Sequence, residues 1–403
     1  MMDMHLGRQG AALQGCTVVE IGLDEAGQYA GRLVAALGAR VIKVEPLLGE
    51  MERLLTPFKV DRNGRRRSIP YEYLNAGKQS LAADLDDPFT VSLIEQLAGG
   101  TGVVLCGESM RKCIPESLSA PVIMASLYGA GVRSAASQAP LTRFQAGPSG
   151  NLLPAPRPVM PATLAADCIA GAGLAVTVMA VLAMRLHDED MASVPQLVAD
   201  HAYAAHAINL EKMFVGRVAQ DNADLNRETH RFPFGGAVRC ADGFVSMLLN
   251  EEHQWQGLCE VMGRLEWATD LRFSGGAGRS RMRSEIESAL DAYCRHRPVA
   301  EVLAAARSRG VPVGGVRSLV DVLDDDFKKA RGFLEPIETA FGLANLVGLP
   351  FGDDPAWAPQ GEAIAPLVGQ HSEEILLELG YSDEKREILQ RLRLVRYGDV
   401  PDQ

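Results

Sequence analysis

One carboxylate in this sequence stands where a protein could use it as a nucleophile. Thr163 follows Pro161 and precedes a long apolar stretch, a pattern that predicts the N-cap of a helix. Asp167 then falls in the first turn of that helix, where the helix dipole and the backbone N–H groups favour a negative charge. Such a carboxylate can attack an acyl group covalently. An aspartate that only complements the dipole fits the same position, and on pattern alone this simpler interpretation is the commoner one.

A dense run of basic residues indicates a second kind of chemistry. Guanidinium and ammonium groups pair with the phosphates of nucleotide-like ligands. A solvated loop accounts for the same run equally well. The run consists of Arg62, Arg65, Arg66 and Arg67, with Lys78 shortly after.

Other site types have little support. Gly235 and Gly236 would let a backbone approach a ligand closely, although a plain hairpin turn also explains them. The eight histidines show no metal-binding spacing, and no GxSxG motif marks a serine hydrolase. The seven cysteines are odd in number and include no CxxC pair, which argues against a disulfide framework or a zinc ribbon. We therefore expect no metal and a reducing compartment.

The elements that must position these side chains begin with a βαβ unit. An apolar run at 16–22, a helical pattern at 25–39 and a second apolar run at 40–46 follow one another within about thirty residues. A helical stretch from 90 to 100 and apolar runs at 101–106 and 121–129 continue the alternation, which predicts a parallel sheet covered by helices. The first turn, GLDEAG, lacks the GxGxxG spacing, so a dinucleotide site is not supported.

The sequence patterns in the second half of the chain predict a long helix, a smaller domain and a helical tail. Helical patterns cover about 165–186 and 194–214, a hairpin is expected at 238–249 around Asp242-Gly243, and a tail helix at about 372–393. The fold class is α/β. We expect a large Rossmann-like domain from residues 1–200 and 335–403, a linker at 201–224, and a small α+β domain at 225–330.

Composition limits the function classes. The chain has 403 residues, 47% of them hydrophobic, and a net charge of -11, which disfavours non-specific nucleic-acid binding. Residues 168–184 carry no charge, but the glycines within this stretch and Asp167 at its start favour a buried helix over a membrane span. The first ten residues lack a signal-peptide layout, so a cytoplasmic protein without membrane association is expected.

Several blocks of sequence, taken in order, resemble class III CoA-transferases of the CaiB/BaiF type. This family includes formyl-CoA transferase and carnitine CoA-transferase, and α-methylacyl-CoA racemases are related to it. The resemblance spans about residues 13–392. Its blocks are LQGCTVVEIG, YLNAGKQSLAADLDDP with the Asn-x-x-Lys-x-Ser pattern at Asn75, Lys78 and Ser80, FQAG around Gln145, and APLVGQHSEEILLELGYS near the C-terminus.

The resemblance implies a fold and a reaction. The fold is a Rossmann-like large domain built from both chain ends, with two ring-like subunits interlocked in a homodimer. Asp167 falls on the position of the catalytic aspartate, which forms a mixed anhydride with the acyl group of an acyl-CoA and then an aspartyl-CoA thioester. Substrates would be an acyl-CoA and a carboxylic acid, with coenzyme A as the carried group. Binding residues implied in this way are Asn75, Lys78, Arg62, Arg65, Arg66, Glu25, Gln145, Gly235 and Gly236.

Some positions depart from the family pattern. Glu25 replaces a first-turn glutamine, LCGESM replaces the usual Glu-Asn-Phe, and Leu141 stands at the position of a glutamate. These changes make oxalate an unexpected acceptor and leave two alternatives open. One is a racemase-like isomerase, although LTRFQAG lacks the histidine typical of that branch. The other is a CoA-binding subunit without turnover.

Overall fold

A computed structural model describes most of the chain and divides it into two compact units. The described residues are 11–99, 102–114, 122–126, 165–187, 197–200, 237–247, 251–318, 334–347 and 364–398, with a few single positions between these ranges. Unit 1 comprises Met1–Gly150, Met160–Asn209 and Phe327–Gln403, and unit 2 comprises Asn151–Val159 and Leu210–Asp326. The domain limits expected from the sequence stay a prediction.

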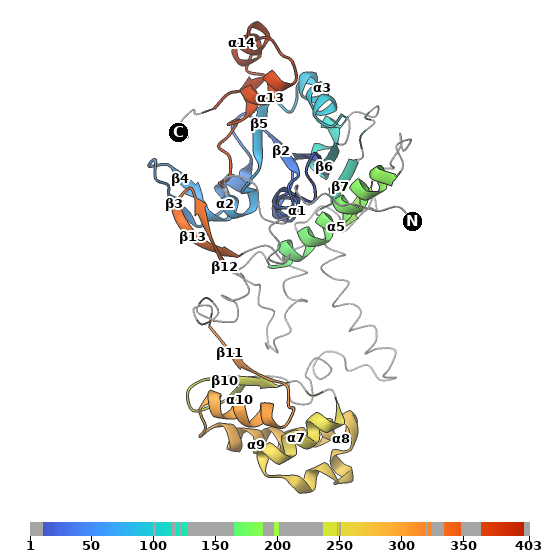
Figure 1. The fold of residues 1–403 in the computed structure, drawn as a ribbon, viewed down its shortest axis with the longest axis vertical. Coiled ribbons are helices and arrows are strands. Elements are labelled where there is room, and N and C mark those ends of the chain that lie inside the picture. The colour runs from blue at the N-terminus through green and yellow to red at the C-terminus, as the bar shows by residue number, and fades with distance from the viewer. Residues whose placement is uncertain are drawn as a thin grey trace, which may run out of the picture. The chain divides into compact units, whose positions relative to one another are not determined.

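Unit 1 is built on a seven-stranded sheet (Figure 1). The strand order is β14-β5-β2-β1-β6-β7-β8, and every pairing is parallel except that of β14 with β5. The C-terminal part of the chain therefore adds an edge strand to a sheet that begins at the N-terminus. The strands are β1 (Thr17–Ile21), β2 (Arg40–Glu45), β5 (Gln79–Ala83), β6 (Val103–Gly107), β7 (Val122–Ser126), β8 (Leu197–Asp200) and β14 (Val395–Arg396).

Helices cover both faces of this sheet because successive strand residues point to opposite sides. Val18 packs with the buried side chains of α1 (Glu25–Ala36) and α5 (Ala165–His187). Val19 packs on the other face with α3 (Pro88–Leu97), α13 (Ser372–Glu378) and α14 (Asp383–Arg391). Both faces are apolar, as a parallel sheet between two helical layers requires.

Shorter elements border the sheet. The 3₁₀ helix η1 (Met51–Leu54) follows β2, helix α2 (Ile69–Asn75) precedes β5, and the 3₁₀ helix η2 (Glu108–Cys113) follows β6. Two antiparallel hairpins complete the described part of unit 1. They are formed by β3 (Phe58–Val60) with β4 (Arg66–Ser68), and by β12 (Leu334–Thr339) with β13 (Gly342–Val347).

Unit 2 has its own α+β core. A three-stranded antiparallel sheet packs with helices around the stacked rings of Trp255, Trp267 and Phe273. Its strands are β9 (Ala237–Arg239), β10 (Phe244–Met247) and β11 (Val313–Val316). Its helices are α7 (Glu252–Met262), η4 (Leu265–Ala268), η5 (Leu271–Phe273), α8 (Gly275–Arg281), α9 (Arg283–Cys294) and α10 (Val299–Ser308).

Most predicted elements are confirmed, and two are wrong. The βαβ unit, the hairpin around Asp242-Gly243 and the long helix after residue 165 are present. The helix expected at 194–214 is contradicted at its start, because Leu197–Asp200 pairs with β7 as a strand. The single tail helix is two helices, since Gly380 adopts φ +83° between α13 and α14. Among the described residues no helix is long and apolar enough to span a membrane.

Candidate active site

The strand order changes direction between β1 and β6, whose carboxyl ends lie side by side. From β1 the chain continues to β2 on one side of β1, and it later reaches β6 on the opposite side of β1. The place where the strand order reverses in this way is called a switch point, and it is the usual ligand site of an open α/β sheet. The two loops pack tightly here. A Cβ on Gly107 would lie 1.8 Å from the carbonyl oxygen of Gly22. A glycine is required at 107 for this close approach.

Helix α1 begins shortly after the carboxyl end of β1 with two acidic residues. Asp24 is its N-cap, and its Oδ1 accepts a hydrogen bond of 2.9 Å from the backbone N–H of Gly27. Glu25 occupies the first turn. Both carboxyl groups therefore lie at the positive end of the helix dipole, where negative charge is stabilised.

A second helix start brings Asp167 to the same place. Asp167 lies in the first turn of α5 and is only 6% exposed. Four residues later on the same face, Gly171 packs against α1 so closely that a Cβ would lie 2.4 Å from the carbonyl oxygen of Ala26. The missing side chain at 171 thus lets the two helices approach at their N-terminal ends.

The result is a cluster of three carboxyl groups. One oxygen from each of Asp24, Glu25 and Asp167 lies within 4.8 Å of the other two. Three such oxygens are half of the six ligands that Mg²⁺ takes. Within the part of the chain that the structure describes, no further acid, histidine or cysteine joins the group. Such a set of acids can share protons among its members, and it can also hold a divalent cation whose remaining ligands are waters.

Burial and like charge change how these groups hold protons. Burial, together with the charges of Glu25, Asp167 and Glu52, raises the pKa of Asp24 to about 7, and the Gly27 N–H only partly opposes this shift. The thiol of Cys168 adjoins Asp167, and burial and the Asp167 charge raise its pKa to about 11. Since a protonated thiol is a poor nucleophile, Asp167 and not Cys168 is the candidate nucleophile.

Lys78 lies beneath α1 in a buried ion pair. Its Nζ is 2.9 Å from both carboxylate oxygens of Glu20 and donates a 2.7 Å hydrogen bond to the carbonyl oxygen of Gln28. Both charged side chains are completely buried. Burial lowers the pKa of Lys78 to about 8, although the Glu20 carboxylate opposes the shift. Three acceptors engage the three N–H donors, so this placement favours an internal role over a phosphate contact.

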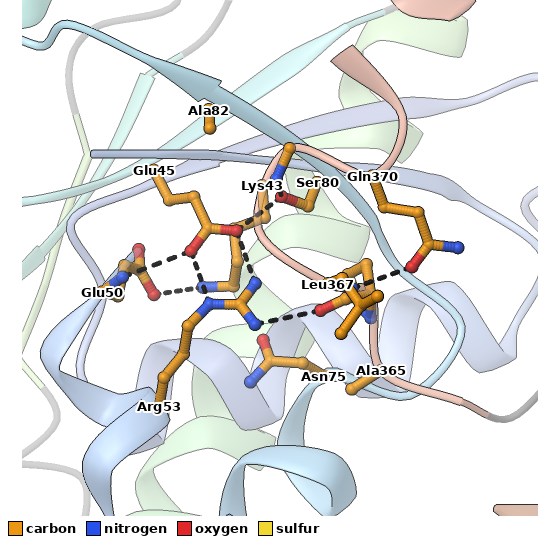
Figure 2. A network of polar contacts seen from close by, with 12 residues as sticks. Lys43, Glu45, Glu50, Arg53, Asn75, Ser80, Ala82, Ala365, Leu367 and Gln370 are labelled. Atoms are coloured by element: carbon orange, nitrogen blue, oxygen red, sulfur yellow. Dashed lines mark hydrogen bonds and ion pairs between the residues drawn. The ribbon is translucent and has the colours of Figure 1, made fainter. Parts of the chain in front are cut away.

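The ion pair continues into a network at the end of β2, shown in Figure 2. Lys43 Nζ lies 2.5 Å from Glu50 Oε2 and 3.9 Å from Glu20 Oε2. Arg53 binds both oxygens of Glu45, at 2.8 and 2.6 Å, and Ser80 Oγ donates to Glu45 at 2.5 Å. These six residues join β1, β2, η1 and β5 into one polar layer.

Opposing effects set the pKa values within this network. Burial raises the pKa of Glu50 to about 7 despite the nearby Lys43 ammonium. The carboxylates of Glu50 and Glu20 outweigh burial and raise the pKa of Lys43. At Glu45 burial would favour the neutral acid, but the Arg53 guanidinium outweighs it and lowers the pKa. Glu50 is thus the acid in this layer that holds a proton most readily.

Asn75 connects the network to α2. Its Nδ2 donates to Gln28 Oε1 at 2.7 Å and to the Tyr71 carbonyl oxygen at 3.2 Å, and Gln28 Nε2 donates in turn to Glu50 Oε2 at 3.1 Å. The side chain of Asn75 is fully buried. This position gives Asn75 a role in holding α1 and α2 together, and leaves its expected contact with coenzyme A a prediction.

The basic run is dispersed over the β3–β4 hairpin. Arg67 is held inside the protein by Glu72 at 2.5 Å and by the Ala365 carbonyl oxygen at 2.6 Å. Arg66 is exposed, with its guanidinium 4.1 Å from the ring centroid of Phe58. Arg62 pairs with Glu338 at 2.5 Å and, with Arg65 and Arg67, lines a cavity of about 550 Å³.

The structure brings the predicted residues Asp167 and Glu25 together and adds Asp24, which the sequence analysis did not include. Asp24 could have been predicted as an N-cap, because aspartate is a preferred residue directly before a helical pattern. The segment GLDEAG was considered only for the spacing of its glycines. The predicted residues Gln145, Gly235 and Gly236 lie outside the described residues.

Comparison with known protein families identifies the family of this chain. The family model described as "CoA-transferase family III" matches residues 13–118 and 132–372. The chain belongs to this family. It is therefore a CoA-transferase, and the resemblance seen in the sequence blocks is confirmed.

Curated family III relatives align over nearly the whole chain. The succinate–glutarate CoA-transferase of Agrobacterium fabrum is 26% identical over 91% of this chain and 95% of its own length. The succinyl-CoA:mesaconate CoA-transferase of Haloarcula marismortui is 27% identical over 92% of this chain and 96% of its own.

Solved structures support the fold. A CAIB/BAIF family protein from Brucella suis aligns with a TM-score of 0.70 at 22% identity, covering 92% of this chain and 100% of its own. A hypothetical protein from Mycobacterium tuberculosis aligns with a TM-score of 0.72 at 21% identity, covering 91% and 99%. At these identities the likeness concerns the fold alone.

Proposed function

We propose that this chain is an acyl-CoA:carboxylate CoA-transferase that works through covalent intermediates on Asp167. The Asp167 carboxylate attacks the carbonyl carbon of the donor thioester, forming a mixed anhydride and releasing coenzyme A. The sulfur of coenzyme A then attacks the aspartyl carbonyl, giving an aspartyl-CoA thioester and freeing the donor acid. An acceptor acid takes the CoA by the reverse sequence.

The observation that carries this proposal is the placement of Asp167. It is a buried carboxylate at a helix N-terminus, beside the switch point of the sheet. The dipole of α5 supports its negative charge before attack. The neighbouring thiol, Cys168, is held protonated and cannot compete with it.

Coenzyme A requires phosphate partners, and we propose Arg62, Arg65 and Arg66 for this role. Two of them line the cavity beside the β3–β4 hairpin, and Arg66 is exposed. Lys78 is a weaker candidate, because its ammonium is already bound by Glu20 and Gln28.

The proposal includes an interlocked homodimer, as the resemblance implies. It draws support from the sheet, where β14 from the chain end pairs with β5 while a separate unit forms between these segments. Native mass spectrometry during dilution tests it. A dimer that persists without unfolding supports the interlocked arrangement, and a monomer at every concentration contradicts it.

Trapping the covalent intermediate tests the reaction. Wild type and Asp167→Asn are incubated separately with acetyl-CoA, isobutyryl-CoA and succinyl-CoA, then with hydroxylamine, and intact mass and released coenzyme A are measured. We expect adducts and turnover in the wild type, and a loss of turnover by orders of magnitude in Asp167→Asn.

The fold of this variant should persist, because a first-turn carboxylate contributes only about 0.3–1 kcal/mol through the helix dipole. Asp87→Asn is a matched control, since Asp87 caps α3 on the other face of the sheet. A folded Asp167→Asn enzyme that turns over at the wild-type rate would refute the assignment. Binding of acyl-CoA without any adduct would instead favour the non-catalytic alternative.

A further inference from the structure

Two cysteines of unit 2 meet in its core. Cys240 directly follows β9, and Cys294 is the last residue of α9. Both are free thiols, both are buried, and a hydrogen bond joins their side chains. Fifty-four positions separate them in the sequence, so no local spacing such as CxxC marks the pair. The fold alone brings the two sulfur atoms together.

Backbone contacts hold the two segments in this alignment. The N–H of Ala241 donates to the carbonyl oxygen of Arg297 at 2.9 Å. The N–H of Val299 donates to Oδ1 of Asp242 at 2.7 Å. These bonds tie the turn between β9 and β10 to the loop between α9 and α10. Two thiols in contact on segments held together in this way are the starting arrangement for a disulfide.

The two thiols are not equivalent. Burial raises the pKa of Cys240, but the hydrogen bond from Cys294 opposes this rise because it stabilises the Cys240 thiolate. Burial, the charge of Cys240 and the same hydrogen bond together raise the pKa of Cys294 to about 12. Cys240 is therefore the thiol that loses its proton more readily, and the thiolate is the form that reacts as a nucleophile.

Cys240 also lies nearer to solvent. It is followed by the exposed residues Ala241 and Asp242 in the turn of the β9–β10 hairpin, whereas Cys294 is completely buried in the core. Surface turns open at a lower cost in free energy than core helices do. Opening of this turn exposes Cys240 to a small oxidant while α9 stays in place.

We propose that Cys240 and Cys294 form a reversible disulfide when the protein meets a hydroperoxide, and that this bond joins the β9–β10 hairpin covalently to α9. With hydrogen peroxide, the Cys240 thiolate attacks one oxygen, the O–O bond breaks, and Cys240 becomes a sulfenic acid. The hydroxide that leaves takes up the proton that Cys240 released, which gives water.

The second step closes the disulfide. The Cys294 sulfur attacks the Cys240 sulfur, an S–S bond forms, and the sulfenic oxygen leaves as water with the proton of Cys294. Two thiols are oxidised, and one hydrogen peroxide is reduced to two waters. The closed loop contains α7, α8 and α9, so the bond restricts the unfolded chain and should stabilise folded unit 2. This inference does not depend on the reaction at Asp167.

Peroxide treatment of the purified wild-type chain tests the proposal. We expect the intact mass without reductant to fall by the mass of two hydrogen atoms, and peptide mapping to find the peptides of Cys240 and Cys294 joined. Dithiothreitol should reverse both changes. The melting temperature of unit 2, followed by the fluorescence of the core residues Trp255 and Trp267, should rise by about 5–15 °C on oxidation.

Three variants test the roles of the two thiols. In Cys294→Ser, a cyclic 1,3-dione should trap the sulfenic acid on Cys240, whereas in Cys240→Ser no such adduct should form on Cys294. Cys259→Ser removes another buried thiol of the same core and is the matched control, which should form the disulfide as the wild type does.

Two outcomes contradict the proposal. Absence of a Cys240–Cys294 cross-link in the folded, peroxide-treated wild type overturns it, and this measurement does not depend on whether any variant folds. A sulfenic acid trapped on Cys294 in Cys240→Ser, with none on Cys240 in Cys294→Ser, overturns the assignment of Cys240 as the attacking thiol.

Discussion

Lys78→Met should destabilise the protein strongly. The change removes an ammonium group that lies 2.9 Å from both oxygens of Glu20, in a place where neither side chain reaches solvent. The carboxylate would remain buried with Lys43, at 3.9 Å, as its nearest cation. Breaking one side of a buried ion pair typically costs about 3–5 kcal/mol. At about 2–4 °C per kcal/mol for a large domain, the melting temperature should fall by about 6–20 °C.

The assay is thermal and urea unfolding of the purified chain, followed by circular dichroism. Arg66→Met is the control, because it removes a charge from an exposed residue of the same basic region and should cost less than 1 kcal/mol. Glu20→Gln combined with Lys78→Met should be less destabilising than Lys78→Met alone, since no unpaired charge is then left inside.

A second perturbation reaches the same ion pair without changing a charge. A Cβ on Gly31 would lie 1.4 Å from Glu20 Oε1 and 2.9 Å from Lys78 Nζ. Gly31→Ala should therefore destabilise the protein, although alanine is normally the better helix residue by about 1 kcal/mol. If Lys78→Met melted at the wild-type temperature but bound coenzyme A weakly, Lys78 would be a ligand contact and the internal role would be wrong.

Three further predictions concern the site and its surroundings. Gly171→Ala should push α5 away from Ala26, which should lower turnover more than tenfold and reduce the free energy of unfolding by about 1–3 kcal/mol. Gly276→Ala is the control, because a Cβ at position 276 would have no atom within 4 Å and should change neither turnover nor stability. Glu50→Gln should flatten the pH dependence of stability. In the folded wild type Glu50 keeps its proton up to about pH 7, whereas in the unfolded chain it releases the proton near pH 4.5, so the free energy of unfolding falls by about 1.4 kcal/mol per pH unit between these values. Urea titrations of wild type and variant at pH 5, 6 and 7 measure this slope. Glu25→Gln should raise kcat/KM for dicarboxylate acceptors relative to monocarboxylate acceptors about fivefold or more, because it removes a repulsion of about 1–4 kcal/mol from the second carboxylate of the acceptor. An unchanged ratio would place the acceptor away from Glu25.

The sheet was predictable because its residues alternate in a simple way. Val18 and Val19 pack on opposite faces, and a run of such residues before a capped helix predicts a βαβ unit. The strand at Leu197–Asp200 was missed because three apolar residues followed by an aspartate are too short a run to show a strand period beside a helical pattern. Its pairing with β7 depends on a contact distant in sequence, and local propensity cannot supply this information.

The site was predictable only in part. The place of Asp167 in the first turn of a helix was predictable because a first-turn acid has a local sequence signature, and its catalytic role stays a prediction from the family resemblance. The partner of Lys78 could not be found in this way. Glu20 lies in an apolar strand fifty-eight positions earlier, and only the parallel sheet brings the two together beneath α1. Charged residues inside otherwise apolar strands, such as Glu20 and Lys43, are nevertheless a signal that buried partners exist.

The buried charges and the carboxyl cluster share one structural element, helix α1. Gln28, one turn into this helix, accepts from Asn75 and donates to Glu50, while Asp24 at its start stands beside Asp167. Buried ion pairs add little net stability compared with apolar packing, but they hold their groups in one geometry when all partners are present. A nucleophile tolerates little displacement from the group that it attacks. We therefore expect the ion network beneath α1 to hold the start of this helix beside Asp167, so that removal of the network impairs both stability and catalysis.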